Sequence, residues 1–362
     1  MSPLTGTTRA EPGTGDPPVP LLRDGGGLAG LAWLTWRQHR WALVTSLVVS
    51  AALAAWMLWL AADMTGVFHQ CHDTICPEGS PQQARLSAPF GPVNLGDKLL
   101  LGEEYVPLLI GVFLGVPLLA REFEQRTLLL AWSQDVSPMR WMWTRLLLLG
   151  LVVAALTAGV SAAAGHLARV LHDVGDGSMF QGQLFLDSGM LPLAAGLSWF
   201  VVGAALGAAV RRVLPAALAV VAGFVAALVA VDWRYPWLVA PVSRFLPFAA
   251  PGSGTPLGAN PLVIQGGIQI GPPDHVVNVF DAAHRPVTFP ELNRWCPNVF
   301  QLGGEDSVAC FTRNGLTHHV VYQPGSRIPE FHLLLASGYT ALGLLALAAV
   351  WLVVRRTALS AG

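Results

Sequence analysis

The sequence predicts an all-α polytopic membrane protein with six transmembrane helices and an extracytoplasmic loop domain between the fifth and the sixth. The chain has 362 residues, of which 53% are hydrophobic and only 12% are charged, whereas soluble domains contain roughly 25% charged residues. Six apolar stretches approach the length of about 20 residues that a bilayer-spanning helix needs. Positive charge flanks alternate connections, as expected on the cytoplasmic side of a membrane protein.

The segment before the first span predicts a tail and a short helix. Met1 to Gly27 is rich in Gly, Pro and Thr and predicts disorder, because it has too little apolar surface to offset the entropy of ordering. It also lacks the features of a secretory signal peptide. Leu28 to Arg40 contains Trp33 and Trp36, residues typical of the headgroup level. This stretch predicts either a helix lying in the inner membrane surface or an inward extension of the first span.

The six predicted spans are unequal. The second contains two prolines, and the fourth and fifth are separated only by Arg211 and Arg212. This double arginine predicts a sharp cytoplasmic hairpin. The spans are Trp41 to Ala62, Tyr105 to Ala120 with an extension from Leu99, Trp141 to Gly165, Met190 to Val210, Val213 to Val231 and Phe331 to Val354.

The charge distribution predicts an orientation in the plasma membrane. With both termini cytoplasmic, Arg residues fall in the inner segment 121–140, in the hairpin of the fourth and fifth spans and in the tail 355–362. Positive charge is retained on that side, and most acidic residues fall in the outer connections. The net charge of -1 gives no indication of nucleic acid as a partner.

The outer connections contain all four cysteines. Proximity in sequence favours the pairs Cys71 with Cys76 and Cys296 with Cys310, although four cysteines allow three pairings. Disulfides persist outside the cytoplasm, and a cross-pairing would join the first outer connection to the last. That last connection, residues 232–330, is too long for a plain loop and predicts an extracytoplasmic cap.

Two kinds of structure are expected within this cap. Tyr235 to Ala250 is apolar and predicts a segment that dips back into the outer leaflet. Leu262 to Ile270 and Val276 to Phe280 have strand-like patterns, and Gly, Pro and Asn separate them.

The charged inner segment after the second span predicts a helix. Glu122 and Glu124 suit the first turn of a helix, and Thr127 to Trp132 is apolar enough to lie against another surface. Pro138 ends this stretch, because proline lacks an N–H and disfavours helix in the residue before it. Taken alone, the charges are typical of a solvated inner loop.

The same segment resembles a known family. Its register of Glu, Thr, Trp and Arg-Trp after an apolar helix is similar to the cytoplasmic coupling segment of ABC-2-type transporter permeases, especially actinobacterial ones. That family often has Gly where this chain has Arg126. The matching residues are Ala120, Arg121, Glu122, Phe123, Glu124, Gln125, Thr127, Ala131, Trp132, Gln134, Arg140 and Trp141.

The resemblance implies an exporter subunit that works as a dimer with a second permease copy and binds separate ATP-binding cassette subunits. It implies that ATP and Mg²⁺ belong to those partners, that spans one, two and five meet at the dimer seam, and that short re-entrant helices precede the last span. The only lysine, Lys98, is followed by Leu99, so a phosphate-binding loop is absent from this polypeptide. The residues implied in ATPase coupling are Arg121, Glu122, Phe123, Glu124, Thr127 and Trp132.

The composition of the spans indicates the cargo class. Ionisable residues are almost absent from them, which suits a lipophilic or amphipathic solute better than an ion. Gly203 and Gly207 predict close helix packing. Glu103 and Glu104, at the outer end of the second span, predict either a substrate contact or cation gate, or residues of the wet interface. The candidates for the substrate path are Glu103, Glu104, Ser50, Ser161 and Thr340.

Two other classes remain open. His69 to Cys76, HQCHDTIC, has the ligand types of a zinc or copper site and would suit a membrane metal-handling protein or enzyme. Oxidised thiols do not bind metal, however, so an outside location favours a disulfide, and we expect no metal site. The second alternative is a membrane anchor or signalling protein whose inner loop binds a partner other than an ATPase. Serine-hydrolase and zinc-protease motifs are absent.

Overall fold

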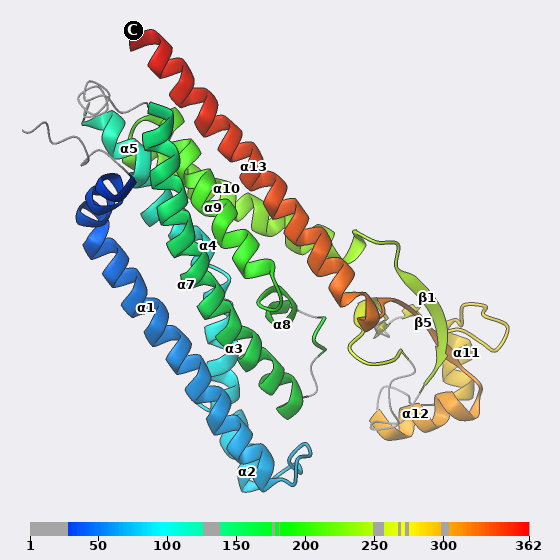
Figure 1. Cartoon of the computed structure of the whole chain (residues 1–362). Coiled ribbons are helices and arrows are strands. Elements are labelled where there is room, and N and C mark those ends of the chain that lie inside the picture. The colour runs from blue at the N-terminus through cyan, green and yellow to red at the C-terminus, as the bar shows by residue number, and fades with distance from the viewer. Residues whose placement is uncertain are drawn as a thin grey trace, which may run out of the picture.

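The computed structural model describes residues 28–125, 138–175, 178–180, 182–248, 257–266, 269–271, 275–297 and 304–361. Within these residues, six helical segments are long and apolar enough to cross a membrane. A three-stranded sheet lies between the fifth and the sixth, beside the helical bundle (Figure 1). The predicted fold class is therefore confirmed.

The bundle consists of five long helices and one segmented span. The long helices are α1 (Leu28–Gln70), α7 (Pro138–Val174), α9 (Leu191–Val210), α10 (Val213–Arg234) and α13 (Ile328–Ala361). The segmented second span comprises α3 (Pro92–Glu103), α4 (Val106–Ile110), the π-helical turn η1 (Gly111–Gly115) and α5 (Val116–Glu124). Two short helices, α2 (Pro81–Ser87) and α8 (Gly182–Leu186), connect the longer ones.

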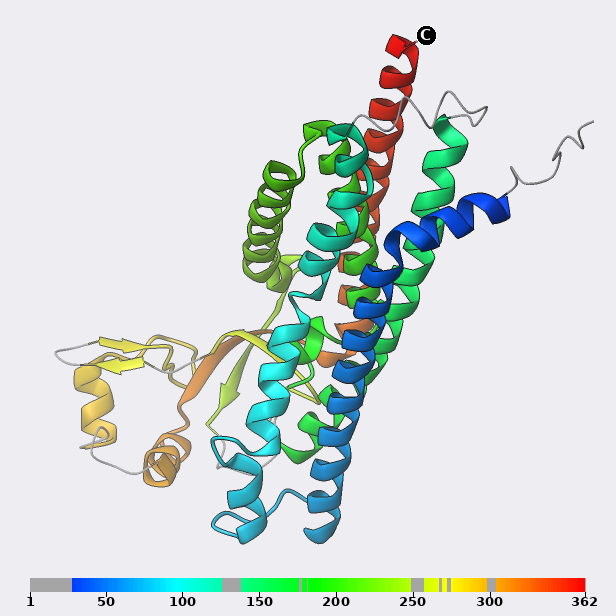
Figure 2. The same ribbon diagram turned by 90° about the vertical axis from the view of Figure 1, so that its left-hand side faces the viewer.

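Helix α1 contains the predicted first span and the turns that precede it. It is continuous from Leu28 to Gln70, and its apolar spanning part begins at Arg40. Figure 2 shows that the first turns run at a steep angle to the rest of the helix. The predicted tail, residues 1–27, lies outside the described residues.

The two prolines of the second span explain its segmentation. Pro107 lies in the first turn of α4 and Pro117 in the first turn of α5. Between them, the N–H of Val116 donates to the carbonyl of Gly111, five residues earlier. Proline interrupts the regular ladder of a helix, and a π-turn accommodates such an interruption by adding one residue to the turn.

Helix α9 forms the centre of the bundle and packs against α5, α7, α10 and α13. At two glycines, its contact with the second span is made by backbone atoms. A Cβ atom at Gly203 would overlap the carbonyl oxygen of Gly111, and one at Gly207 would lie 2.5 Å from the carbonyl oxygen of Val116. The close packing predicted for Gly203 and Gly207 is therefore confirmed, because any side chain there would separate the two helices.

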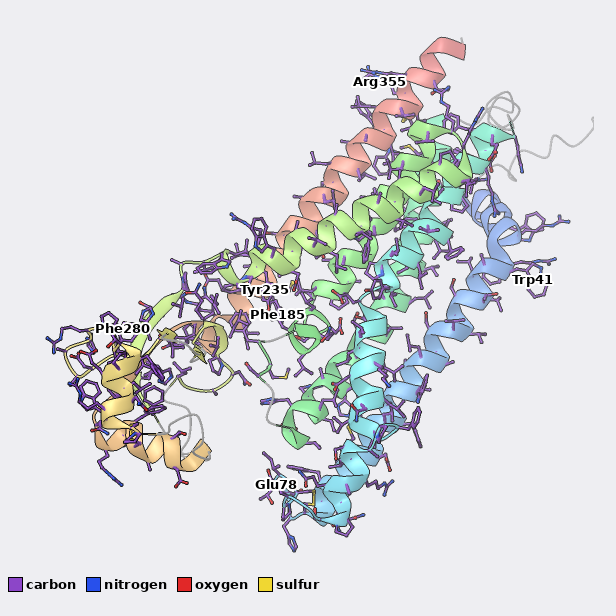
Figure 3. All side chains as sticks on the ribbon, turned by 180° about the vertical axis from the view of Figure 1, so that it is seen from behind. Trp41, Glu78, Phe185, Tyr235, Phe280 and Arg355 are labelled. Atoms are coloured by element: carbon purple, nitrogen blue, oxygen red, sulfur yellow. A yellow bond between two sulfur atoms is a disulfide. The ribbon has the colours of Figure 1, made fainter. Side chains whose placement is uncertain are left out.

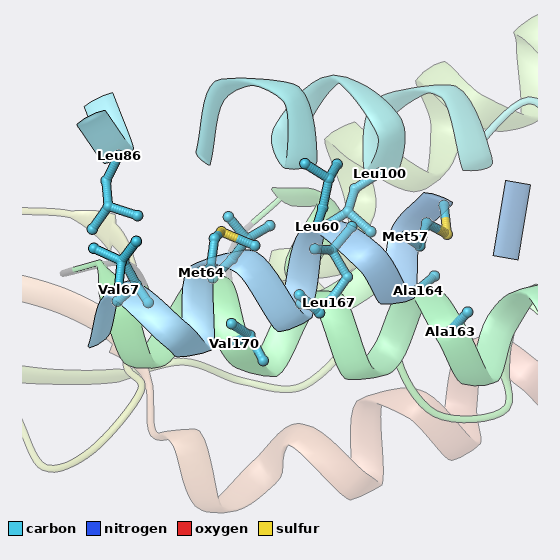
Figure 4. Close-up of a cluster of buried hydrophobic side chains, with 14 of the residues drawn as sticks. Met57, Leu60, Met64, Val67, Leu86, Leu100, Ala163, Ala164, Leu167 and Val170 are labelled. Atoms are coloured by element: carbon cyan, nitrogen blue, oxygen red, sulfur yellow. The ribbon is translucent and has the colours of Figure 1, made fainter. Parts of the chain in front are cut away.

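An apolar cluster joins the C-terminal halves of α1 and α7 to α3 (Figure 4). Met57, Leu60 and Met64 of α1 are buried against Leu100 of α3 and Leu167 of α7. The disulfide between Cys71 and Cys76 closes the turn after α1 at the edge of this cluster. This confirms the first of the two favoured cysteine pairs.

The described residues of the cap form two small sheets and two helices. Strand β5 (Thr317–Gln323) pairs antiparallel with β1 (Val242–Pro247) on one side and β2 (Leu262–Gln265) on the other. Strands β3 (Gln269–Gly271) and β4 (His275–Val277) form a separate hairpin. Helices α11 (Phe289–Trp295) and α12 (Gly304–Arg313) follow, and the disulfide between Cys296 and Cys310 joins them. The second favoured cysteine pair is therefore also confirmed.

The prediction that Tyr235 to Ala250 dips back into the membrane was wrong for its described part. This stretch forms the 3-10 turn η2 (Tyr235–Trp237) and strand β1. Strand β5, which was not predicted from the sequence, supplies hydrogen-bonding partners for the β1 backbone. Leu246 is buried against Val320 and Tyr322, so this apolar side chain packs inside the cap rather than against lipid.

The two ends of the bundle carry different elements. Figures 1 and 2 place the end of α5, the hairpin between α9 and α10 and the C-terminal end of α13 at one end. The cap and α2 lie toward the other end. We call these the inner and the outer end, after the charge distribution of the sequence.

Candidate functional site

The predicted coupling residues Arg121, Glu122, Phe123 and Glu124 form the last turn of α5 at the inner end. The expectation that Glu122 and Glu124 begin a helix was wrong, because the helix of the second span continues through them. Carboxylates at a helix C-terminus are electrostatically unfavourable unless they have other partners. Thr127 and Trp132 lie outside the described residues.

Glu122 has a partner on α7. Its Oε1 atom lies 2.7 Å from Nη1 of Arg145, and the two side chains are only 17% and 5% exposed. The Arg145 guanidinium also lies over the ring of Trp141, 4.2 Å from its centroid. Glu122 therefore connects α5 to α7 in a partly dehydrated contact rather than extending into solvent.

Glu124 and Phe123 contact the hairpin between α9 and α10. The backbone N–H of Val213, at the start of α10, donates to Oε2 of Glu124 over 3.4 Å. This contact places a carboxylate at a helix N-terminus, where the partial positive charge is favourable. The guanidinium of Arg211, whose left-handed backbone ends α9, lies 5.2 Å from the Phe123 ring centroid. The predicted double-arginine hairpin thus packs directly on the end of α5.

An open groove of about 540 Å³ runs between α1, the second span and α7. Its volume lies within the range of roughly 300–1,000 Å³ that is typical of small-molecule sites. The lining is mainly apolar, with a few hydroxyl groups on α1 and α7 and the guanidinium of Arg121. The lining residues on α1 are Trp41, Ala42, Thr45, Ser46, Val49, Ser50 and Leu53.

This groove was not predicted as a unit, although its helical spacing is visible in the sequence. Positions 41, 45, 49 and 53 recur every four residues and therefore share one face of α1. Phe113 and Pro117 of the second span and Val153 and Val160 of α7 form the facing walls. Periodicity identifies the face, but it does not identify the helices opposite it.

The structure separates the predicted substrate-path residues. Ser50 lines the groove, whereas Glu103 and Glu104 line a different cavity near the outer end. Ser161 lies on α7 and is buried. The hydroxyl of Thr340, on α13, donates to the carbonyl of Ala336 over 2.7 Å. The five residues therefore do not form one site.

The outer stretch from His69 to Cys76 was the candidate for metal binding. Its two cysteines are bonded to one another, so their sulfur atoms are not thiolate ligands. His69 Nδ1 lies 2.5 Å from Oδ1 of Asp73, and both side chains are exposed. Among the described residues, no group of three His, Cys, Asp or Glu side chains is arranged to hold a metal ion.

Two family models match the chain. Residues 47–234, which extend from within α1 to the end of α10, match the model described as ABC-2 membrane transporter related. Residues 237–328, which comprise the cap, match a domain of unknown function (DUF8319). No curated protein and no solved structure matches the chain. Because the first match covers just over half of the chain, the protein belongs to the ABC-2 membrane transporter related family.

Proposed function

We propose that this protein is the transmembrane permease subunit of an ATP-driven exporter and that it moves a lipophilic or amphipathic solute. Membership of the ABC-2 membrane transporter related family supports a transport role. The energy would come from a separate ATP-binding subunit, because the single lysine of the chain stands outside any phosphate-binding motif.

One observation carries this proposal: α5 belongs both to the wall of the groove and to the inner-end contacts. Pro117 and Arg121 line the groove, while Glu122 and Glu124, on the same short helix, contact α7 and α10. A force applied to the segment after α5 would therefore reach the groove wall through about two turns of helix.

We place the inner end in the cytoplasm and the protein in the plasma membrane. Arg140, Arg145, Arg211 and Arg355 are at or near the inner ends of their helices, and basic residues favour the cytoplasmic side. An ATP-binding subunit would therefore dock on the side where α5 ends.

We further propose that a second permease copy covers the face formed by α10, the second span and α1. These segments follow one another across the near face in Figure 2. Val48 on α1 and Leu218 on α10 are 61% and 62% exposed. Both helices bury few residues within this single chain.

The proposal is tested by reconstituting the chain in liposomes with a P-loop ATPase encoded in the same genome. The expected result is MgATP-dependent movement of a fluorescent phospholipid analogue or a lipophilic dye across the bilayer. Replacing the P-loop lysine of the ATPase with Ala should abolish this movement. In the control without any ATPase, the chain should insert in the bilayer and transport nothing.

A crosslinking experiment tests the docking side independently. Gln125, directly after α5, is exposed, and a Gln125→Cys variant should crosslink to the ATPase from the cytoplasmic side. Labelling of this cysteine from the outside of intact cells would overturn both the orientation and the proposed partner.

A further inference from the structure

Four carboxyl groups from distant parts of the chain converge near the outer end of the bundle. Glu103 ends α3 and Glu104 follows it, Asp187 follows α8, and Asp232 lies in the last turn of α10. All four line one cavity of about 50 Å³. This cavity is separate from the large groove, whose lining includes none of these residues.

Glu103 and Asp187 are almost completely buried, since each is only 2% exposed. Both carboxyl groups line the same cavity, and the charge of Glu103 is among the causes that raise the pKa of Asp187. Two neighbouring carboxyl groups can share a hydrogen bond when one of them is protonated. One oxygen of each group, Oε1 of Glu103 and Oδ2 of Asp187, is buried and has no hydrogen-bond partner among the described residues. A buried oxygen that accepts no hydrogen bond costs free energy. A bound hydrogen-bond donor would therefore stabilise this cavity.

The described residues that line the cavity include no Lys, Arg or His to balance the acids. Among the described residues, neither Glu103, Glu104, Asp187 nor Asp232 forms an ion pair with Lys, Arg or His. Burial, followed by the charge of Glu103, raises the pKa of Asp187. The site is therefore a concentration of acceptors that a cation would stabilise.

Aromatic rings complete the lining. Trp199 of α9 and Phe224 of α10 meet edge to face with their centroids 5.2 Å apart, and Tyr339 of α13 lines the same cavity. Rings of this kind attract organic cations through the negative face of the π-system. Carboxylates combined with aromatic walls favour an alkylammonium group over a strongly hydrated inorganic ion.

We propose that this cavity binds the ammonium group of an amphipathic amine, and that the bound amine replaces the proton shared by Glu103 and Asp187. One positive charge enters and one proton leaves, so the charge of the cavity is unchanged. The cavity volume suits a head group and not a drug-sized molecule, so the alkyl part would extend along the neighbouring helices. This inference rests on the proposed export function, for which it names a substrate class.

Carbodiimide labelling tests the proposal without a transport assay. N,N′-dicyclohexylcarbodiimide adds a protonated carboxyl group across its C=N bond, and the adduct rearranges to a stable N-acylurea. The full chain in lipid nanodiscs should be labelled at Glu103 or Asp187, as identified by peptide mass spectrometry. Decylammonium should reduce this labelling at least several-fold, whereas decanol and decyl sulfate, with the same chain length, should not.

Other titratable groups surround Glu103 and Asp187, and protection by the amine should depend on pH. Glu104, Asp232 and Tyr339 line the same cavity, and Tyr235 and His332 lie in the adjoining aromatic cluster around Phe185. Because the amine competes with the shared proton, protection by decylammonium should strengthen as the pH rises, as long as the amine remains protonated.

Matched variants distinguish the site from general membrane effects. Glu103→Gln should remove most of the protection of Asp187, and Asp187→Asn should remove most of the protection of Glu103. Glu78→Gln should leave protection unchanged, because Glu78 is exposed at the far tip of the bundle, away from Phe185 and Tyr235 (Figure 3). Equal protection by decanol, or protection by sodium ions alone, would overturn the proposal.

The outcome separates this inference from the proposed function. If the amine fails to protect while ATP-driven transport of other solutes persists, only the substrate class is wrong. If the amine protects but no ATPase drives transport, the binding site stands and the exporter assignment is wrong.

Discussion

Arg145 Nη1 of α7 lies 2.7 Å from Glu122 Oε1 in the last turn of α5. This ion pair joins two spans at the end of the bundle where the chain enters the predicted coupling segment. Because the arginine is only 5% exposed, loss of its partner would leave a nearly buried charge. Variants of this ion pair therefore test whether it fixes the end of α5 against α7.

The first prediction concerns this pair. Glu122→Gln should destabilise the protein by about 1–3 kcal/mol, the range for a charged hydrogen bond lost in a partly buried site. Thermal unfolding in detergent would measure the loss. The double variant Glu122→Gln/Arg145→Met should recover part of it, since it also removes the nearly buried guanidinium. A double variant that is less stable than the additive sum of the single variants would contradict direct pairing.

The second prediction concerns coupling. Replacing Glu122 and Glu124 with Ala should separate ATP hydrolysis by the partner from solute movement, because α5 would lose its contacts with α7 and α10. ATP turnover and dye movement, measured on the same liposomes, would show the separation. Glu78→Ala serves as the control, and unchanged coupling in the α5 variant would reject the role of these two residues.

The third prediction concerns the groove. Ser50→Trp should fill part of the space between α1 and α7 and reduce transport at least several-fold without preventing membrane insertion. Ser337→Trp, at an exposed position of α13 that does not line the groove, should transport normally. Equal losses in both variants would indicate a general effect of tryptophan on the membrane helices.

The fourth prediction concerns the backbone contact between α9 and the second span. Gly203→Ala should cost about 1–3 kcal/mol, because the added methyl group would overlap the Gly111 carbonyl and overpacking in cores costs this much. Gly159→Ala on α7 has no atom within 4 Å of the new Cβ and should be neutral or more stable by up to about 1 kcal/mol. Unfolding of the two variants under identical conditions provides the comparison.

The fifth prediction concerns Asp187 and pH. Its folded-state pKa lies above its ordinary value because of burial and the Glu103 charge. Its contribution to stability is therefore complete below the ordinary carboxyl range, about pH 4, and declines as the pH rises toward the folded-state pKa. Asp187→Asn should make the melting temperature depend less on pH over this range. A decline of equal slope in the variant would place the responsible group elsewhere.

Much of the architecture could be predicted because it depends on local properties of the chain. The apolar stretches, the arginine hairpin, the small residues of α9 and both disulfides were anticipated correctly. Each of these depends on composition or on residues close in sequence. The ATPase-coupling role of Arg121 to Glu124 stays a prediction, and Thr127 and Trp132 lie outside the described residues.

The errors have a common physical origin. Glu122 and Glu124 resemble a helix start, but their favourable partners are Arg145 and the N-terminus of α10, which no local pattern reveals. The stretch after α10 has the apolarity of a membrane segment, yet β1 pairs with β5, whose residues lie about 75 positions later. In both cases a contact distant in sequence overrode the local preference.

The sequence by itself determined the number of spans, their charge asymmetry and the absence of a nucleotide-binding loop, because apolar length and residue type act locally on the choice between water and lipid. Only the tertiary structure decided which polar groups meet. It brought Asp187 to Glu103 and Arg145 to Glu122, and it formed the groove from three separate spans. The physical reason is that hydropathy specifies the environment of a side chain, whereas its partners are specified by the packing of helices that lie far apart along the chain.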